Sequence, residues 1–359
     1  MINLTEKLSD IKTIGIIGGG QLGQMMAISA IYMGYKVIVL DPDETCPASH
    51  VAKQIVAKYD DQQAIAELAE QADILTYEFE NVSADALAPY EAKLPQGLDL
   101  LRISQNRILE KAFLVEAGIK VAPYIVVNTP ADLDALDLSI KHVVKTATGG
   151  YDGHGQVVVE KAEDLTAARE LSADHACVAE SYVDYLKEIS VIVSGNGTAF
   201  SVFPTCENQH KNNILDKTIM PARISPYLEK EARQIALTIA KKMKLAGTMC
   251  IEMFVTQHDI LVNEIAPRPH NSGHATIEAC DFSQFDLHIR GVLGQDLPKV
   301  VLQSPAIMLQ VLGQDMAAAA KFAQDNPSTH LHLYGKIEAK ENRKMGHVTV
   351  LTDDYTLSL

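Results

Sequence analysis

Strands and helices alternate along the first hundred residues, and this alternation limits the fold more than any other feature of the sequence. Two apolar runs, "TIGIIG" at residues 13–18 and "KVIVLD" at residues 36–41, predict buried strands, and residues 21–33 between them predict a helix. A second helix is expected near residues 60–71, followed by the strand "DILTYEFE" at residues 73–80. Parallel strands need such crossover helices, so this segment predicts an α/β domain built on a parallel sheet.

The regular alternation lapses around residues 95–100, where we expect a domain boundary. Beyond it the order of elements is mixed, so the chain as a whole is α+β. We expect a helix at residues 104–117, a long helix at 226–244, a hairpin within 247–267, and a tail of short strands and one alanine-rich helix after residue 297. A chain of 359 residues exceeds the usual size of one domain. No long linker separates the segments, so two or three tightly packed domains are expected, with sites between them.

Composition excludes several classes of function. The formal net charge of −15 argues against a surface for nucleic acid or for an anionic membrane. No apolar run approaches the ~20 residues that cross a bilayer, and the polar start "MINLTEKLSD" does not predict a signal peptide. The five cysteines are scattered without a CxxC pair, which favours neither a zinc site nor a disulfide framework. We therefore expect a cytoplasmic protein that acts on small molecules.

A glycine-rich turn follows the first predicted strand. Gly18, Gly20 and Gly23 form the pattern G-x-G-x-x-G between a strand and a helix, where backbone N–H groups and the helix N-terminus attract phosphate. Asp41 ends the next strand, about where a ribose-binding acid is expected in a dinucleotide site. The pattern is typical of nicotinamide dehydrogenases, but it also fits binding of another phosphate, or a turn that only packs a Rossmann-like domain.

A second glycine-rich stretch, "KTATGGYDGHGQ" at residues 145–156, links two predicted strands. It is not a Walker A loop, because it lacks the G-x-x-x-x-G-K-[ST] spacing. Lys145 lies on the strand just before it. A mobile glycine loop beside a strand lysine can close over nucleotide phosphates with its backbone N–H groups, so residues 148–156 are predicted to form a lid. The alternative is a flexible hairpin loop that binds nothing.

The predicted hairpin carries two acids within apolar strands. If its turn is residues 257–259, Glu252 and Glu264 lie directly opposite, with Cβ atoms about 5 Å apart. Like charges so placed destabilise a hairpin unless a cation lies between them, and Mg²⁺ typically takes one or two carboxylates plus substrate phosphates. Asn263 or Asn271 could add an oxygen. Two solvated glutamates are the alternative, which the apolar neighbours on both sides disfavour.

The stretch "LVNEIAPRPHNSGHATIEA" at residues 261–279 continues from this hairpin. Together with Lys145 and the glycine lid, its acid provides what ATP phosphoryl transfer needs without a P-loop. Arg268 would neutralise charge on the transferring phosphoryl group. Two prolines stiffen the loop, so that His270, Asn271 and His274 present hydrogen bonds to a second substrate.

Five stretches, in order, resemble one family of ATP-grasp enzymes over essentially the whole chain: "GIIGGGQLGQM", "TYEFENV", "TGGYDGHGQ", "NEIAPRPHNSGH" and "LHLYGK…RKMGH". The family is that of the N5-carboxyaminoimidazole ribonucleotide synthetases of purine biosynthesis. The resemblance implies a Rossmann-like domain at residues 1–105, a two-part ATP-grasp domain at 106–297 and a small β-rich C-terminal domain at 298–359, assembled as a homodimer.

The resemblance also implies roles for individual residues. Contacts to ATP are implied at Arg107, Lys145, Gly150, Gly153, Glu180, Ser181, Tyr182, Val183, Glu188, Asn263 and Glu264. Contacts to the aminoimidazole ribotide are implied at Gly20, Gln21, Leu22, Glu80, Asn81, Tyr151, His270, Asn271, Lys336 and Arg343. Glu252 and Glu264 would bind Mg²⁺, or Mn²⁺ in its place, and Asp152, Arg268 and Lys336 would be catalytic. The position of His154 more often holds Arg or Lys in this family, so no charge-holding role is assigned to that histidine.

The implied reaction has two steps. Bicarbonate attacks the γ-phosphoryl group of ATP to give carboxyphosphate and ADP, and the exocyclic amine of the ribotide is then carboxylated, with Asp152 receiving its proton. Water must be kept out, because carboxyphosphate hydrolyses readily, and this gives the lid a chemical purpose. On this interpretation residues 18–23 bind the monophosphate of the ribotide and not a dinucleotide.

Three other functions were weighed against this one. A formate-dependent glycinamide ribonucleotide transformylase would share the domain layout and a ribotide substrate, but "GYDGHGQ" and "RPHNSGH" fit the carboxylase better. A nicotinamide oxidoreductase would explain the first glycine turn alone. A nucleotide-binding regulatory module without turnover would not need such a dense cluster of ionisable residues.

Overall fold

The structure is a computed structural model that describes residues 13–150 and 155–359. Its N-terminal part is a parallel sheet of order β3-β2-β1-β4 flanked by helices. This confirms the α/β start predicted from the alternation, although the short strand "KQIV" was not predicted. The strands and helices are β1 Thr13–Ile17, α2 Gln21–Tyr32, β2 Lys36–Asp41, β3 Lys53–Val56, α3 Gln62–Gln71, β4 Ile74–Tyr77, α4 Ala84–Leu87 and α5 Leu98–Ser104.

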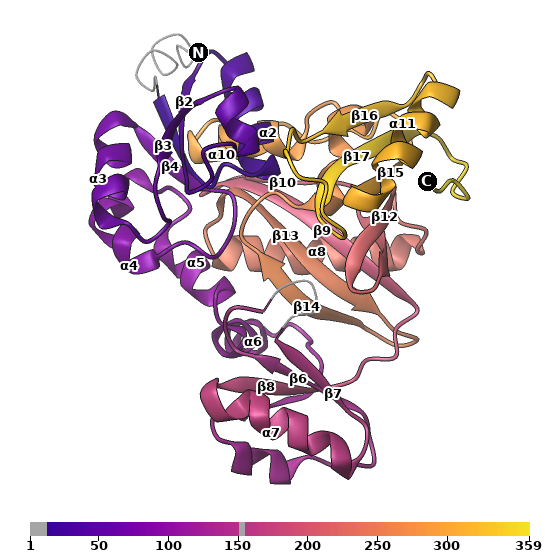
Figure 1. Ribbon diagram of the computed structural model, residues 1–359. Coiled ribbons are helices and arrows are strands. Elements are labelled where there is room, and N and C mark those ends of the chain that lie inside the picture. Colours follow the sequence, from indigo (N-terminus) through magenta and orange to yellow (C-terminus); the bar gives the residue numbers. More distant parts are fainter. Residues whose placement is uncertain (1–12, 151–154) are drawn as a thin grey trace.

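A small antiparallel sheet of order β5-β8-β6-β7 forms the lower lobe of the molecule in Figure 1. The predicted helix at residues 104–117 begins later than expected. The side chain of Asn106 accepts hydrogen bonds from the N–H groups of Ile108 and Leu109 and so caps a new helix there. The elements are α6 Arg107–Glu116, β5 Tyr124–Val127, β6 His142–Thr146, β7 Gln156–Val159, α7 Leu165–Asp174 and β8 Cys177–Ser181.

The third sheet is the largest, with nine strands among the described residues, in the order β14-β13-β9-β11-β12-β15-β17-β16 and with β10 paired to β9. The hairpin of β11 and β12 was not predicted; it turns at Asn212 and Asn213, which both have positive φ as a tight hairpin requires. The elements are β9 Lys187–Asn196, β10 Phe200–Val202, β11 Cys206–Lys211, β12 Ile214–Met220, α8 Pro226–Lys242, β13 Ala246–Val255, β14 Ile260–Ala266, α9 Thr276–Ala279 and α10 Gln284–Val292.

The C-terminal strands extend this large sheet. Strand β15 pairs with β12, and β17 and β16 follow it, so the tail predicted as a small domain shares backbone hydrogen bonds with the central part (Figure 1). Its elements are β15 Ala306–Leu312, α11 Met316–Asp325, β16 His330–Leu333 and β17 Lys344–Leu351. None of the helices in the described parts of the chain has the length and apolar character to span a membrane.

Helix α10 joins the N-terminal sheet to the central one. Phe285 and Ile289 pack in one core with Ile14, Ile16 and Met26 of the first domain. On its other side the helix contacts β13 and β9. The helix was not predicted from the sequence, although its apolar residues Phe285, Ile289 and Val292 recur at helical spacing.

A buried chain of hydrogen bonds crosses the same junction. The backbone N–H of Thr248 donates to Nδ1 of His288 at 3.1 Å, and Nε2 of His288 lies 2.9 Å from Oγ1 of Thr76. Thr76 in turn donates to Gln96 at 2.5 Å, and Gln96 donates to the carbonyl of Pro267. Nδ1 must therefore be unprotonated, and burial lowers the pKa of His288 to about 3.

The neutral His288 predicts an acid-sensitive junction. Because its pKa is lower in the folded than in the unfolded state, the unfolded chain binds the extra proton between pH 6.5 and about 3, and stability is lost as the pH falls through this window. We expect the unfolding free energy of the wild type to decline there more steeply than that of His288→Asn, by up to ~1.4 kcal/mol per pH unit. Urea denaturation at several pH values measures the slopes. The exposed His175→Asn serves as the control and should keep the wild-type slope; equal slopes for His288→Asn would contradict the prediction.

Candidate active site

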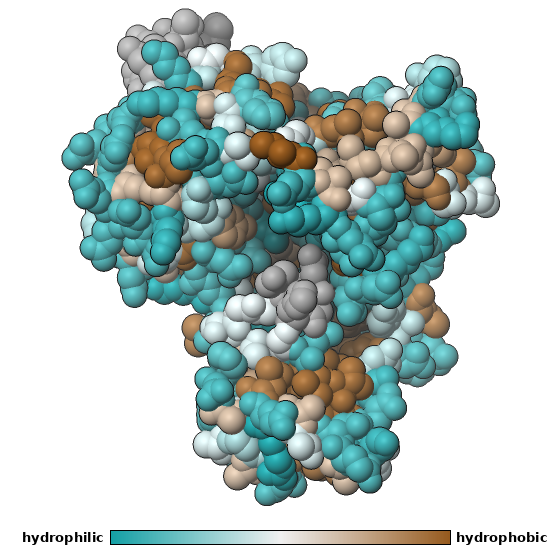
Figure 2. Space-filling model, in the orientation of Figure 1, coloured by the Kyte–Doolittle hydropathy of each residue, from teal (hydrophilic) through white to brown (hydrophobic). Residues whose placement is uncertain are grey.

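A cavity of about 570 Å³ lies between the small antiparallel sheet and the open face of the large one. In Figure 2 hydrophilic residues dominate the surface between the N-terminal domain and the C-terminal strands, above the lower lobe. The cavity collects most of the residues singled out from the sequence, from segments far apart in the chain. These are Glu80, Asn81, Arg107, Lys145, Gly150, Glu180, Ser181, Tyr182, Val183, Glu188, Glu252, Asn263, Glu264, Arg268, His270 and Asn271.

Glu252 and Glu264 face each other across the β13–β14 hairpin, as predicted. The turn that produces this pairing differs from the three-residue turn assumed in the prediction. The turn is four residues long, since Val255 pairs with Ile260, and a bulge after Glu252 restores the opposition of the two acids. The bulge places Asn263 as the extra residue, and its side chain also lines the cavity.

Each of the two acids has a basic partner in the protein. Arg107 Nη1 lies 2.9 Å from Glu264 Oε2, and His270 Nε2 lies 2.9 Å from Glu252 Oε1. Burial opposes ionisation of Glu264, but the Arg107 guanidinium outweighs it and lowers the pKa of this carboxyl to about 2. Glu264 is therefore an anion at neutral pH, as a metal ligand must be.

The donor set fits a hard cation only in part. Oxygen atoms of Glu252, Glu264 and Asn263 suit Mg²⁺. Among residues 13–150 and 155–359, however, no three or more His, Cys, Asp or Glu side chains are grouped to hold a metal ion. Two carboxylates would thus leave most of an octahedral shell to water and to phosphate oxygens of a bound nucleotide.

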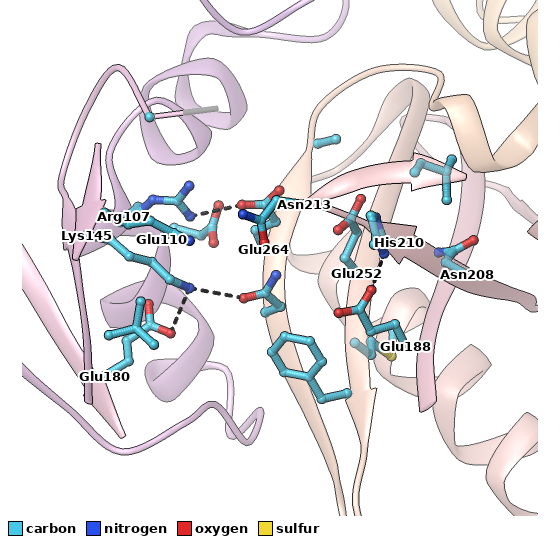
Figure 3. A pocket seen from close by; sticks show the side chains of 18 of the residues that line it. Arg107, Glu110, Lys145, Glu180, Glu188, Asn208, His210, Asn213, Glu252 and Glu264 are labelled. Atoms are coloured by element: carbon cyan, nitrogen blue, oxygen red, sulfur yellow. Dashed lines mark hydrogen bonds and ion pairs between the residues drawn. The ribbon is translucent and has the colours of Figure 1, made fainter. Parts of the chain in front are cut away.

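A buried ion-pair network supports Lys145. Lys111 Nζ lies 3.1 Å from Oε1 of Glu180 in an ion pair. Lys145 donates to Oε2 of Glu180 at 3.2 Å (Figure 3) and lies 3.5 Å from Oδ1 of Asn263. Burial disfavours ionisation of Glu180, yet the two lysines outweigh it and hold its pKa below the usual value. Because Lys111 already neutralises Glu180, Lys145 can turn toward a phosphate without leaving that carboxylate unpaired.

The opposite end of the cavity holds a second acid–base pair. Glu188 on β9 contacts Nδ1 of His210 on the neighbouring strand β11, as Figure 3 shows. Burial opposes protonation of His210, but Glu188 outweighs it and raises the pKa of the imidazole. Tyr182 is half exposed and lies beneath the Lys141 ammonium, 4.3 Å from it. Residues 180–183, which the family resemblance implies as contacts to ATP, all line the cavity.

The loop after β14 is held by its own contacts. Arg268 Nε donates to Glu80 Oε2 at 2.9 Å, which brings the "FENV" stretch against this loop. Both ring nitrogens of His270 have partners in the protein, Glu252 at Nε2 and Ser272 Oγ at Nδ1 (2.8 Å). His270 would have to give up one of them to hydrogen-bond a ligand. Asn271 lines the cavity, whereas His274 is fully buried and does not reach it, contrary to the prediction.

The glycine turn of the first domain is closed by carboxylates. Gly19 donates its N–H to Asp41 at 2.7 Å, and Gly20 and Gly23 donate to Glu78. Burial raises the pKa of Glu78 to about 7, although these N–H groups oppose the rise. A phosphate could reach the turn only by displacing Glu78. The arrangement argues against a dinucleotide site and leaves the predicted phosphate contact at this turn without support in this structure.

Several predicted residues lie away from the cavity. Gly20, Gln21, Leu22, Lys336 and Arg343 are not among its lining residues. Lys336 donates to the carbonyl of Lys344 at 2.8 Å, and burial lowers its pKa to about 8. The charge of Arg343 also lowers this pKa, whereas that of Glu78 raises it. Tyr151, Asp152, Gly153 and His154 lie outside the described residues, as does the centre of the predicted lid.

Sequence reasoning missed three residues that line the cavity, Glu110, Asn208 and His210, and the buried Lys111 behind it. Glu110 accepts from the N–H of Ile265 at 3.3 Å, and burial next to Glu264 raises its pKa to about 8. Lys111 follows it in the chain and supports Glu180. Asn208 and His210 line the cavity from β11. Their i, i+2 spacing before an Asn-Asn turn was the signal for a hairpin with a polar face.

Three segments of the chain match known protein families. Residues 11–97 match the ribonucleotide synthetase preATP-grasp domain, residues 112–285 the ATP-grasp domain, and residues 306–357 the phosphoribosylaminoimidazole carboxylase C-terminal domain. The N5-carboxyaminoimidazole ribonucleotide synthase of Staphylococcus saprophyticus is 49% identical over 357 residues, which cover 97% of this chain and 95% of the relative.

Solved structures agree with these matches. The N5-carboxyaminoimidazole synthetase of Staphylococcus aureus, complexed with ADP, has 47% identity and a TM-score of 0.90, over 96% of this chain and 94% of that one. The Aspergillus clavatus enzyme in complex with ADP and 5-aminoimidazole ribonucleotide has 31% identity and a TM-score of 0.89, over 95% and 94% of the two chains.

Proposed function

The chain belongs to the N5-carboxyaminoimidazole ribonucleotide synthase family, and from this premise we propose that its cavity binds ATP and Mg²⁺ for the carboxylation of aminoimidazole ribonucleotide. The enzymes of this family are ATP-dependent ligases of purine biosynthesis that use bicarbonate. The observation that carries the assignment to this cavity is the convergence of Arg107, Lys145 and Glu264 from three separate elements.

The charged residues of the cavity indicate where each part of ATP would bind. The segment of residues 180–183 would take the adenine, and Glu188 the ribose hydroxyls. Arg107 and Lys145 would contact the phosphates, and Glu252 and Glu264 would hold Mg²⁺, which supplies charge neutralisation at the phosphates. Arg107 would then exchange its contact with Glu264 for one to phosphate, as cation and nucleotide arrive together.

The chemistry proceeds in two balanced steps. An oxygen of bicarbonate attacks the γ-phosphorus, the bond to the β-phosphate oxygen breaks, and ADP leaves. The exocyclic nitrogen of the ribotide then forms a bond to the carbon of carboxyphosphate, or of CO₂ released from it, while the carbon–oxygen bond to phosphate breaks. Arg268 would offset the charge on the transferring phosphoryl group, and Asp152 would receive the proton of the amine.

The ribotide would lie between the loop after β14 and the first domain. Asn271, Glu80 and Asn81 border the cavity on that side, and Arg268 joins Glu80 to the loop. Contacts from Gly20, Gln21, Leu22, Tyr151, His270, Lys336 and Arg343 remain predictions from the family resemblance, as does assembly into a homodimer.

One assay tests the proposed function against its rivals. ADP release is measured with ATP, Mg²⁺ and bicarbonate, with and without aminoimidazole ribonucleotide. We expect rapid ADP release only with the ribotide present, no replacement of bicarbonate by formate, and no saturable binding of NAD or NADP at millimolar concentration. ADP release that requires formate and glycinamide ribonucleotide would support the transformylase instead, and hydride transfer would support the oxidoreductase.

A further inference from the structure

The loop that borders the cavity after β14 rests on a buried histidine. Asn271 lines the cavity, and three residues later His274 is fully buried, with its Nε2 atom 3.2 Å from Oδ1 of Asn271. The other ring nitrogen of His274, Nδ1, is buried and has no hydrogen-bond partner among the described residues. The hydrogen bond to Asn271 is therefore the polar contact by which this imidazole acts on its surroundings.

The difference between the two ring nitrogens, one with a partner and one without, assigns the proton of His274. A neutral imidazole carries one N–H, and a buried N–H without an acceptor costs more than a buried lone pair without a donor. The proton therefore resides on Nε2 and is donated to Oδ1 of Asn271. With its oxygen so engaged, the amide of Asn271 offers its NH₂ group to the cavity, as a donor and not as an acceptor.

The surroundings keep His274 neutral and fixed. Its ring stacks on His347 of β17 at a centroid distance of 4.5 Å, and His347 stacks on His332 of β16 at the same distance. Phe285 packs against its other side at 5.9 Å. Burial lowers the pKa of His274 well below the usual value, and the nearby charges of His270, His332 and Lys344 lower it further. A ring held in such a stack cannot flip without disturbing two strands.

We propose that His274 is a positioning residue for the ribotide: its Nε2–H fixes the amide of Asn271 so that the NH₂ group is presented to an acceptor atom of the substrate. The proposal rests on the proposed function, because it takes Asn271 to be a ribotide contact. It assigns a task to the buried His274, which does not itself reach the cavity.

The first test is a comparison of two substitutions at His274. His274→Gln keeps an amide N–H near the position of Nε2, whereas His274→Met fills the space without a donor. Steady-state kinetics should give His274→Met a ribotide KM raised about five- to tenfold, the effect of misplacing one neutral hydrogen bond, with the KM for ATP within about twofold of wild type. His274→Gln should stay close to wild type. Equal increases in both KM values for His274→Met would overturn the proposal, because a loosened loop affects both substrates.

A double-mutant cycle connects the effect to Asn271. In an Asn271→Ala background, His274→Met should add no further increase in ribotide KM, because the amide it orients is gone. Additive increases would contradict the proposal.

A third experiment tests the donor assignment without altering the buried core. Asn271→Asp still accepts from His274 but presents an acceptor to the cavity, so its ribotide KM should match that of Asn271→Ala. A wild-type ribotide KM in Asn271→Asp would refute the assignment. Wild-type turnover in the same assay reports on the proposed function separately: if wild type turns over the ribotide and these variants show no selective effect, only the present inference fails.

Discussion

Replacement of Glu264 by Gln should reduce the rate of ribotide-dependent ADP release by about 10²–10³-fold at ordinary Mg²⁺ concentration. The amide keeps the size of the side chain but removes the charge that faces Glu252 across the hairpin. That charge also pairs with Arg107 at 2.9 Å, so the substitution removes both the proposed metal ligand and the partner of Arg107. ADP release at saturating ATP, with thermal unfolding as a check on folding, gives the measurement.

The matched control for this variant is Glu170→Gln on helix α7, which makes the same chemical change at an exposed position outside the cavity lining. It should keep wild-type turnover. Near-normal ADP release by Glu264→Gln at the same Mg²⁺ concentration would remove Glu264 from the metal site.

Replacement of Lys145 by Met should lower kcat/KM for ATP by about 10²–10³-fold, since one preorganised donor to the transferring phosphates is lost in a buried site. The fold should survive this change. Glu180 keeps its contact to Lys111 at 3.1 Å, so no buried carboxylate is left without a partner. Initial rates at varied ATP concentration, together with the melting temperature, separate a catalytic loss from an unstable protein.

Lys161→Met provides the comparison for Lys145, because Lys161 is exposed, follows the end of strand β7 and does not line the cavity. Unchanged kcat/KM is expected there. If Lys145→Met binds and cleaves ATP as well as Lys161→Met does, the lysine of β6 has no part in phosphate binding, and the ATP end of the cavity must be reassigned.

The predictable parts of the fold are those that leave a pattern in neighbouring residues of the sequence. Apolar runs bounded by glycine and polar turns revealed strands β1, β2 and β4, and their alternation with helices predicted correctly that they run parallel, but not their order in the sheet. Helix α10 was not predicted, although Phe285, Ile289 and Val292 recur at the spacing of one helix face. The junction of β12 with β15 joins residues nearly 90 positions apart, and no local pattern records such a pairing.

The candidate site was likewise predictable only where its residues lie close together in the sequence. The opposition of Glu252 and Glu264 was predicted correctly from a turn length that proved wrong, since the bulge that compensates for the longer turn leaves no mark in the sequence. Residue types within one motif were found, but partners supplied by distant segments were not. The closing of the glycine turn by Glu78 is such a case: 55 residues separate Gly23 from its acceptor. The polar face of β11 was visible in the sequence and was overlooked.

The most direct test of the account follows oxygen from bicarbonate to phosphate. Wild-type enzyme is supplied with ATP, Mg²⁺, aminoimidazole ribonucleotide and fresh bicarbonate labelled with ¹⁸O, and the phosphate and the ribotide product are examined by mass spectrometry. If bicarbonate attacks the γ-phosphorus, phosphate carries one ¹⁸O atom, ADP and carboxylated ribotide form in equal amounts, and neither forms without bicarbonate. Unlabelled phosphate, released with ADP at the same rate when bicarbonate is absent, would contradict the central claim that this chain uses ATP to activate bicarbonate.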